Sequence, residues 1–430
     1  MKALHVSASD GGGGAARAAY RIHQAISRLS DSSWSSEMLV ARRMSEDMAT
    51  IQHLEGNRFL RSAVDITRRV LDQEALASRT PNGVFRSPAR LPTAISRRII
   101  ELCPDVVVLH WLGSRMMSVR QIGHLASHSR PLAWVLHDSW TFCGAEHYPH
   151  DEADRRFVDG YLRSNRLEGE RGLDLNRRVW ERKRRLWTRP IHLIAPSAWM
   201  AEQASRSAIA ADWPVTVIPN PLDAAWWGGL QRSDARRRLE IAPDAPVLIY
   251  GALGGDKDTR KGADLLFAAL ENVGTTHGIA PSRPLEVLTF GGRPGTRRVG
   301  QHTVRSVGAL DDEGLRLHYS AADVMIVPSR MESFGQTATE AITCGTPVVA
   351  FRTGGLTDIV DDGVNGRLAE PFSPTSLARA IEWVLEWPER HRRLSAAARS
   401  TSSRWEPDRI AKRYVALFDR MLEDRASENQ

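Results

Sequence analysis

Two glutamates, Glu332 in a short polar turn and Glu340 in the predicted helix that follows it, could hold a hydroxyl-rich ligand between them. Eight residues of helix would span roughly 12 Å, so these carboxylates are too far apart to share one proton or one metal ion. They could instead hold opposite ends of an extended ligand. Between them, Ser333-Phe334-Gly335 leads into a helix N-terminus, whose free N–H groups favour an anion. A sugar nucleotide has this order of parts, with hydroxyls on either side of a diphosphate. The alternative is two acids with no joint function.

The residues around this pair predict a strand, a turn and a helix. An apolar run from Val324 to Val327 is closed by Pro328, as in a buried strand. A helix is predicted from Gln336 to Cys344, and it ends before Gly345. This setting distinguishes the glutamate pair from the chance matches that isolated short motifs give.

The stretch from Pro328 to Ala350 reads P-S-R-M-E-S-F-G-Q-T-A-T-E-A-I-T-C-G-T-P-V-V-A. It resembles the donor-site signature of the retaining GT-B glycosyltransferases of the GT4, or glycosyltransferase group 1, family. The stretch from Gly354 to Leu368 fits the same family, and weaker matches run along most of the chain. The resemblance implies an α/β protein of the GT-B fold, with two doubly wound, Rossmann-like domains facing across a cleft.

The resemblance also implies roles for residues of the second half. Glu340 would hold the ribose hydroxyls, and Glu332 would act at the transferred sugar as a catalytic residue. The leaving diphosphate would be neutralised by two cations beside a glycine-rich turn and by a helix N-terminus, and Leu310 would pack on the base. Ala252 stands where many members have an arginine, so either Arg260 or Lys257 is expected to replace it. The implied donor-binding residues are Gly13, Gly14, Arg260, Lys261, Leu310, Ser333, Phe334, Gly335 and Glu340.

A glycine run near the N-terminus lies between a predicted strand, Ala3 to Val6, and a predicted helix, Ala15 to about Leu29. Such a turn lets the backbone approach a phosphate or a sugar closely. Its spacing is not that of the dinucleotide-binding motif, and a bare glycine run is more often a flexible turn. In the family, the glycines at Gly13 and Gly14 would face the donor.

Two further predicted strands, 104–109 and 132–136, end at His110 and His137. Open α/β sheets bind ligands at this carboxyl edge. From His137 the chain reads H-D-S-W-T-F-C-G-A-E-H-Y-P, which resembles the acceptor-side loop of exopolysaccharide transferases related to the colanic-acid group. This implies a catalytic His137 near the transferred sugar, and acceptor contacts from Trp140, Phe142, Glu146, His147 and Tyr148.

Two alternatives remain for this loop. It could be a packed loop with aromatic anchors. It could also bind a metal ion through Cys143, His147, His150 and Asp151, although no regular zinc spacing is present. Members of the family need no metal ion and no cofactor, and the chain has no D-x-D motif in a suitable turn.

A basic helix is predicted over residues 177–189, with Arg182, Lys183, Arg184 and Arg185 among its cations. Its apolar residues, Val179, Trp180, Leu186 and Trp187, share one face. Either this face packs on the protein, or the helix docks on an anionic membrane surface, where lipid-linked acceptors are found. No nucleic-acid-binding motif accompanies the positive charge, so a nucleic-acid partner is not expected.

The domain boundary is predicted at a proline-containing linker, residues 219–223. Residues 1–221 would form the acceptor-side domain, and residues 222–406 the nucleotide-sugar domain. A C-terminal helix at 407–424 would pack back on the first domain. Residues 42–98, rich in Arg and Ser, could be helices packed on the first domain or an inserted segment.

Composition indicates the cellular compartment in which the protein is expected. Among 430 residues, the three cysteines are far apart in sequence, which indicates a reducing compartment without a disulfide framework. No apolar run approaches the roughly 20 residues that a membrane span needs. The formal net charge of +7 allows attraction to anionic partners. A cytoplasmic protein is expected, located either freely or at the inner face of the membrane.

The family resemblance implies a retaining hexosyltransferase. Its partners would be a nucleotide-diphosphate sugar and a glycan or lipid-linked glycan, in cell-surface polysaccharide biosynthesis. One alternative is a sugar-nucleotide epimerase on the same fold, which would use no acceptor. Another is a protein that binds nucleotide sugars or a membrane surface without catalysis.

Overall fold

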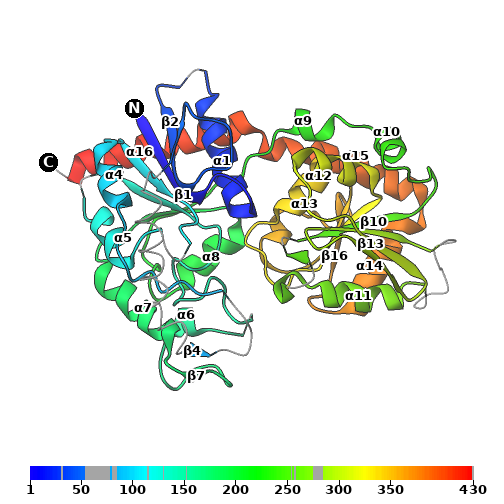
Figure 1. The fold of residues 1–430 in the computed structure, drawn as a ribbon, viewed down its shortest axis with the longest axis horizontal. Coiled ribbons are helices and arrows are strands. Elements are labelled where there is room, and N and C mark those ends of the chain that lie inside the picture. The colour runs from blue at the N-terminus through cyan, green and yellow to red at the C-terminus, as the bar shows by residue number, and fades with distance from the viewer. Residues whose placement is uncertain are drawn as a thin grey trace. The chain divides into compact units, whose positions relative to one another are not determined.

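The computed structural model describes residues 1–30, 32–53, 78–79, 85–113, 116–128, 130–151, 153–252, 254–255, 258–274 and 284–428. Much of the 42–98 segment, and Lys257, therefore lie outside the described residues. The chain divides into two units: unit 1 is Met1–Pro221 with Pro407–Gln430, and unit 2 is Leu222–Glu406. Each unit contains one seven-stranded sheet flanked by helices (Figure 1). The predicted fold class, two doubly wound Rossmann-like domains of the GT-B type, is confirmed.

The sheet of unit 1 is parallel throughout, in the order β3-β2-β1-β5-β6-β8-β9. Its strands at 106–109 and 132–135 are apolar runs without polar alternation, because helices cover both faces of the sheet. The strands are β1 (Lys2–Ser9), β2 (Ser35–Arg42), β3 (Ile51–His53), β5 (Val106–Leu109), β6 (Leu132–Val135), β8 (His192–Ala195) and β9 (Val215–Val217).

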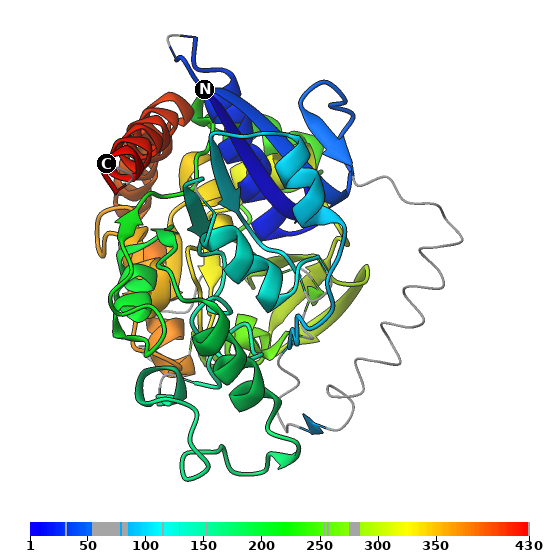
Figure 2. The ribbon, with the colours of Figure 1, turned by 90° about the vertical axis from the view of Figure 1, so that its left-hand side faces the viewer.

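Helices α1 (Gly14–Ser27) and α16 (Pro407–Glu428) cover one face of this sheet, where Ile22, Tyr414 and Phe418 are buried. Figure 2 shows α16 in red along one side of unit 1. The other face carries α4 (Ile95–Glu101), α5 (Val119–Ala126), α7 (Leu175–Leu186) and α8 (Ala198–Arg206). Further elements of unit 1 are α6 (Arg156–Asp159) and the small antiparallel pair β4 (Ser78–Arg79) and β7 (Arg171–Gly172).

The sheet of unit 2 has the order β12-β13-β11-β10-β14-β15-β16, and only β12 runs antiparallel to its neighbour. The predicted strand 324–327 is confirmed as β14. The strands are β10 (Val247–Gly251), β11 (Glu286–Phe290), β12 (Gly295–Val299), β13 (His302–Ser306), β14 (Val324–Val327), β15 (Val348–Phe351) and β16 (Gly366–Ala369).

One face of this second sheet packs on α11 (Ala263–Asn272) and α14 (Pro374–Glu386), and the other on α10 (Arg232–Arg238), α12 (Asp312–Ala321) and α13 (Gln336–Thr343). The predicted helix at 336–344 is thus confirmed to within one residue. Shorter or peripheral elements are α9 (Ala224–Gly228), α15 (Pro388–Thr401), η2 (Thr259–Lys261), η3 (Gly354–Asp358) and η4 (Ser402–Trp405). No helix within the described residues is both long and apolar enough to cross a bilayer.

Candidate functional site

Two charged residues predicted to act on the donor, Lys261 and Glu332, form an ion pair in unit 2. Lys261 Nζ lies 2.5 Å from Glu332 Oε2, and Ser329 Oγ donates a hydrogen bond of 3.3 Å to the same oxygen. Burial alone would raise the pKa of Glu332, but the charges of Lys261 and Arg260 outweigh it and lower that pKa below its usual value. Glu332 is therefore ionised at neutral pH.

Arg330, which the sequence analysis did not single out, fastens the basic turn of η2 to the turn after β14. Its guanidinium binds Asp264 at the start of α11 in a bidentate manner, at 2.8 and 2.6 Å. It also donates to the carbonyl of Thr259 at 2.7 Å, while its backbone N–H donates to the carbonyl of Arg260 at 2.8 Å. Hydrogen bonding from Arg330 lowers the pKa of Asp264. These contacts fix the two basic residues beside the Glu332 turn.

Two glycines, Gly262 and Gly354, let neighbouring segments pack closely against the turn that contains Glu332. Gly262 has φ +69°, and a Cβ added there would lie 1.9 Å from the carbonyl oxygen of Pro328. Gly354 has φ +59°, and its Cβ would lie 2.4 Å from the carbonyl oxygen of Glu332. The N–H of Gly355 donates to that same oxygen at 2.8 Å. The backbone of Glu332 is thus held in place by η3 as well as by η2.

Helix α13 begins directly after this turn, at the N-cap residue Gly335, with no acidic side chain in its first turn. Ser333 and Phe334, which precede it, are buried. Glu340 lies within the helix, is 1% exposed and accepts a hydrogen bond of 3.2 Å from the hydroxyl of Tyr319 on α12. Its predicted contact with a ribose stays a prediction.

Two other predicted donor contacts in unit 2 are placed as follows. The guanidinium of Arg260 binds Asp258 at 2.8 Å, so it is oriented by its own turn. Leu310 is half-buried and packs against the core below α12. In unit 1, Gly13 is the N-cap of α1 and Gly14 its first residue. Their contact with a donor also stays a prediction.

The candidate acceptor side in unit 1 is a small cavity at the carboxyl ends of β5 and β6. Three ring systems predicted from the sequence line it, those of His137, Trp140 and His147, together with His110, Trp111 and Asp138. His137 Nε2 lies 3.0 Å from His110 Nδ1, and burial lowers the pKa of His137 to about 4. His137 is therefore a neutral imidazole.

His147 uses both of its ring nitrogens within the protein. Its Nδ1 lies 2.5 Å from Asp138 Oδ2, and its Nε2 lies 2.6 Å from Ser87 Oγ. Trp140 donates its indole N–H to the Ser87 carbonyl at 3.1 Å. These side chains are buried and bonded to one another, as the packed-loop alternative describes, and acceptor contacts through Trp140 and His147 stay a prediction.

Glu146 and Phe142 are buried as well, and Tyr161 donates a short hydrogen bond to Glu146 Oε1. Tyr148 is half-buried, and its hydroxyl lies 3.4 Å from the carbonyl oxygen of His137. An acceptor contact through Tyr148 stays a prediction. Among the residues that the structure describes, no group of three or more His, Cys, Asp and Glu could hold a metal ion, so the metal alternative for this loop gains no support.

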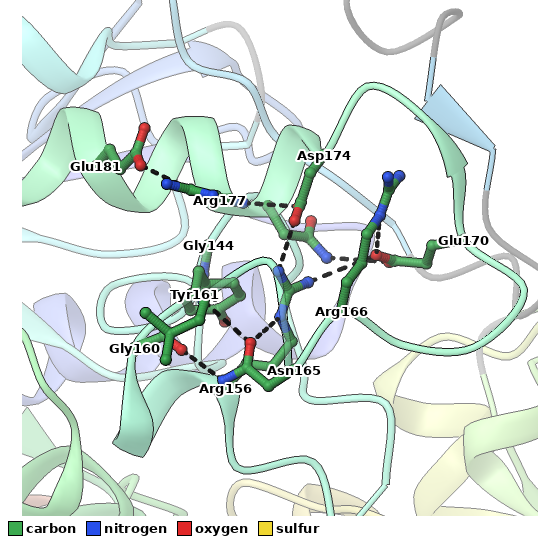
Figure 3. Close-up of polar contacts among 12 residues, drawn as sticks. Gly144, Arg156, Gly160, Tyr161, Asn165, Arg166, Glu170, Asp174, Arg177 and Glu181 are labelled. Atoms are coloured by element: carbon green, nitrogen blue, oxygen red, sulfur yellow. Dashed lines mark hydrogen bonds and ion pairs between the residues drawn. The ribbon is translucent and has the colours of Figure 1, made fainter.

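An ionic network around Arg156 is connected to the loop that follows His137 (Figure 3). Arg156 is almost fully buried and binds Asp174 at 2.6 Å, Glu170 at 3.5 Å and Asn165 at 3.3 Å. Its guanidinium lies 4.6 Å from the ring centroid of Tyr161, whose hydroxyl accepts from the N–H of Gly144 at 2.9 Å. The network therefore ties residues 156–174 to the loop that follows His137.

The basic helix, observed as α7, corrects the membrane-docking hypothesis. Val179, Trp180 and Trp187 are buried in the core of unit 1, so the apolar face is not available to a membrane. Lys183, one of the four cations proposed to contact lipid, is 0% exposed. Its ammonium donates to the carbonyls of Trp140, Cys143 and Gly144, and it lies 3.8 Å from the ring centroid of Trp140. Lys183 is thus an internal support of the loop.

Replacing Lys183 by Met is expected to lower the free energy of unfolding by at least about 2 kcal/mol, since each buried carbonyl left without a donor costs about 1–3 kcal/mol. The control is Arg185→Met on the same helix, where the side chain is exposed. That change should alter stability by no more than about 0.5 kcal/mol. Urea unfolding of both variants measures the difference. Equal effects would contradict the internal role of Lys183.

Comparison with known proteins agrees with the predicted donor-site signature. Residues 298–401, which include Glu332 and Glu340, match the family described as glycosyl transferases group 1. The D-inositol 3-phosphate glycosyltransferase of Geodermatophilus obscurus is 36% identical over 251 residues, covering 55% of this chain and 54% of the relative. That of Xylanimonas cellulosilytica is 36% identical over 212 residues, covering 47% and 46%. The chain thus spans about half the length of the curated relatives it matches.

Solved structures resemble the chain over nearly its whole length. Sucrose-phosphate synthase of Thermosynechococcus elongatus has a TM-score of 0.67 at 18% identity, covering 99% of this chain and 100% of its own. HepE of Anabaena, solved with UDP-glucose, has a TM-score of 0.62 at 17% identity, covering 97% and 98%. At these identities the likeness establishes the shared fold.

Proposed function

We propose that this chain is a group 1 glycosyltransferase that transfers a hexose from a nucleotide-diphosphate sugar to a hydroxyl acceptor with retention of configuration. The observation that carries the proposal is the cationic turn at 259–261, fastened by Arg330 beside the buried carboxylate of Glu332 and just before the N-terminus of α13. Basic side chains and the N–H groups of a helix N-terminus, on one side of a carboxylate, suit a diphosphate joined to a sugar.

In the proposed reaction, the bond from the anomeric carbon to the diphosphate oxygen breaks and a bond to the acceptor oxygen forms. The acceptor hydroxyl proton passes to the departing phosphate. Negative charge develops on the phosphate, where Arg260, Lys261 and the first N–H groups of α13 stabilise it. Positive charge develops on the sugar, where the Glu332 carboxylate is favourable. Glu340 would bind the ribose, which the reaction leaves unchanged.

Before the donor binds, Lys261 is paired with Glu332. A donor diphosphate carries more charge than one carboxylate, so it would draw Lys261 toward itself. Glu332 would then lose part of its neutralisation, which makes it a stronger electrostatic partner for the sugar at the moment of transfer. No metal ion is needed to neutralise the diphosphate in this arrangement.

The donor and the acceptor are proposed from the relatives. Because HepE was solved with UDP and with UDP-glucose, a uridine nucleotide is the first candidate for the donor. The acceptor would be a glycan or lipid-linked glycan of a cell-surface polysaccharide, as the likeness to exopolysaccharide transferases implies. The curated relatives support a second candidate, a phosphorylated cyclitol. Three free cysteines support a reducing, cytoplasmic location.

A screen of nucleotide sugars by thermal unfolding, in buffer with a chelator, tests the donor site. A ligand at a hundred times its Kd stabilises a protein by about 2.7 kcal/mol, so the correct donor should raise Tm by several degrees. UDP-glucose is the first ligand to compare, with UDP and uridine as controls. The shift should be the same with magnesium in place of the chelator. A shift that appears only with the metal ion would contradict the role of Arg260 and Lys261.

A further inference from the structure

Three histidines lie in a row across the sheet of unit 1. His5 is in β1, His110 directly follows β5, and His137 follows β6 by two residues, and these strands are neighbours in the order β1-β5-β6. His5 pairs with Val108, so each ring lies further toward the carboxyl edge than the one before it. His5 Nδ1 is 2.9 Å from His110 Nε2, and His110 Nδ1 is 3.0 Å from His137 Nε2.

The rings of this histidine row are neutral. Burial lowers the pKa of His5 and of His110 well below 6.5, and that of His137 to about 4. The nearest titratable groups do not reverse this. His23 on α1 lies between Ser36 and Thr50, and Asp138 binds His147. Burial also lowers the pKa of His23, to about 4.

A neutral imidazole has one N–H and one bare nitrogen. His110 is bonded through both nitrogens, so it donates in one of these bonds and accepts in the other. The two bonds must therefore point the same way along the row. Either all three rings carry the proton on Nδ1, or all three carry it on Nε2.

The His5 end of the row decides whether the protons lie on Nδ1 or on Nε2. His5 Nε2 is buried and has no hydrogen-bond partner among the described residues. With protons on Nε2, this end would be an unpaired buried N–H, and such groups are rarer in proteins than buried acceptors left short of a bond. With protons on Nδ1, the end is a bare nitrogen. The Nδ1–H direction is favoured, and it directs the N–H of His137 away from His110.

We propose that His5 and His110 are positioning residues that hold His137 as the neutral Nδ1–H tautomer, so that it donates a hydrogen bond to an oxygen of a sugar or phosphate bound beside it. This assignment deepens the proposed function and rests on it for the identity of the ligand. It excludes His137 as a general base through Nδ1, because that nitrogen already carries the proton.

Long-range proton–nitrogen NMR of the full chain labelled with ¹⁵N-histidine tests the tautomer without any substrate. The His137 signals are assigned by their loss in His137→Gln. At pH 7 the expected result is a pyrrole-type Nδ1 and a pyridine-type Nε2 at His137. A pyrrole-type Nε2, or two protonated nitrogens, would overturn the proposal.

His110→Phe removes the partner of His137 Nε2 and should shift the His137 nitrogens toward averaged values of both tautomers. His124→Phe, on the exposed side of α5, is the matched control and should leave them unchanged. Unchanged His137 signals in His110→Phe would show that His110 does not set the tautomer. A chain without transfer activity would contradict the proposed function but would not alter these spectra, so the two failures are distinguishable.

Discussion

Replacing Glu332 by Gln should reduce turnover by roughly ten- to a hundredfold while the affinity for the nucleoside diphosphate is kept or increased. The loss in turnover follows from removing a carboxylate that meets developing positive charge, since an interaction with a charged group is worth roughly 1.5–3 kcal/mol. The kept affinity follows from the ion pair, because Lys261 no longer has Glu332 as a competing partner. Steady-state kinetics and titration with the nucleoside diphosphate measure the two quantities.

The control for this change is Glu389→Gln, an exposed glutamate that is also paired with an arginine, Arg392, at 2.8 Å. It should change neither turnover nor affinity, because exposed ion pairs contribute little. Normal turnover in Glu332→Gln would show that this carboxylate does not act on the sugar. Weaker diphosphate binding would show that the ion pair helps to build the site and does not compete with the ligand.

Gly262→Ala is expected to lower the free energy of unfolding by about 2–5 kcal/mol and to reduce turnover at least tenfold in the protein that remains folded. The new Cβ would lie 1.9 Å from the carbonyl oxygen of Pro328, so η2 must move away from the Glu332 turn. Overpacking costs about 1–3 kcal/mol, and a left-handed backbone costs a non-glycine residue about 1–2 kcal/mol more. The displacement separates Lys261 from Glu332.

Gly363→Ala is the matched control, because Gly363 also has a positive φ, +76°, but nothing lies within 4 Å of its added Cβ. Its free energy of unfolding should fall only by the cost of the left-handed backbone, and it should keep full turnover. Urea unfolding and kinetics of the two variants isolate the contribution of the close approach. Equal losses in both variants would contradict the requirement for contact between η2 and the turn after β14.

The sequence predicted the elements of the donor half well, because their limits depend on local signals. Pro328 ends β14 and Gly345 follows α13, so both elements are placed to within one residue. The glutamates and the basic turn were also identified. Their mutual contact was not, since Lys261 and Glu332 are 71 residues apart in the chain and nothing local records the pairing.

The supports of the site were missed for a similar reason. Arg330 lies in a polar turn, so the sequence suggests a solvated cation. Its ion pair with Asp264 is evident only in the structure. Lys183 lies in a run of basic residues, so its sequence neighbours suggest an exposed side chain. In the structure it is buried and donates to three loop carbonyls that are distant in sequence. His5 was also missed, although a histidine within the predicted apolar strand 3–6 is a signal, because buried polar groups usually have a hydrogen-bond partner within the fold.

The acceptor loop could not be interpreted from residue types alone. Aromatic and histidine side chains that stack on a sugar are also those that anchor a packed loop. In the structure, His147 is bonded to Asp138 and Ser87, and Trp140 packs on Lys183. The sequence could not distinguish the two uses, because Ser87 and Lys183 come from distant parts of the chain.

Release of nucleoside diphosphate from a nucleotide sugar, measured with and without acceptor, is the direct test of glycosyl transfer by this chain. The donor identified by thermal unfolding is incubated with the protein, and glycans and phosphorylated cyclitols are added in turn. We expect release that depends on one class of acceptor, with the same anomeric configuration in the product as in the donor. Conversion of the donor to an isomer without acceptor would indicate an epimerase. Binding of the donor without release or conversion, across the whole acceptor panel, would contradict the assignment of this chain as a glycosyltransferase.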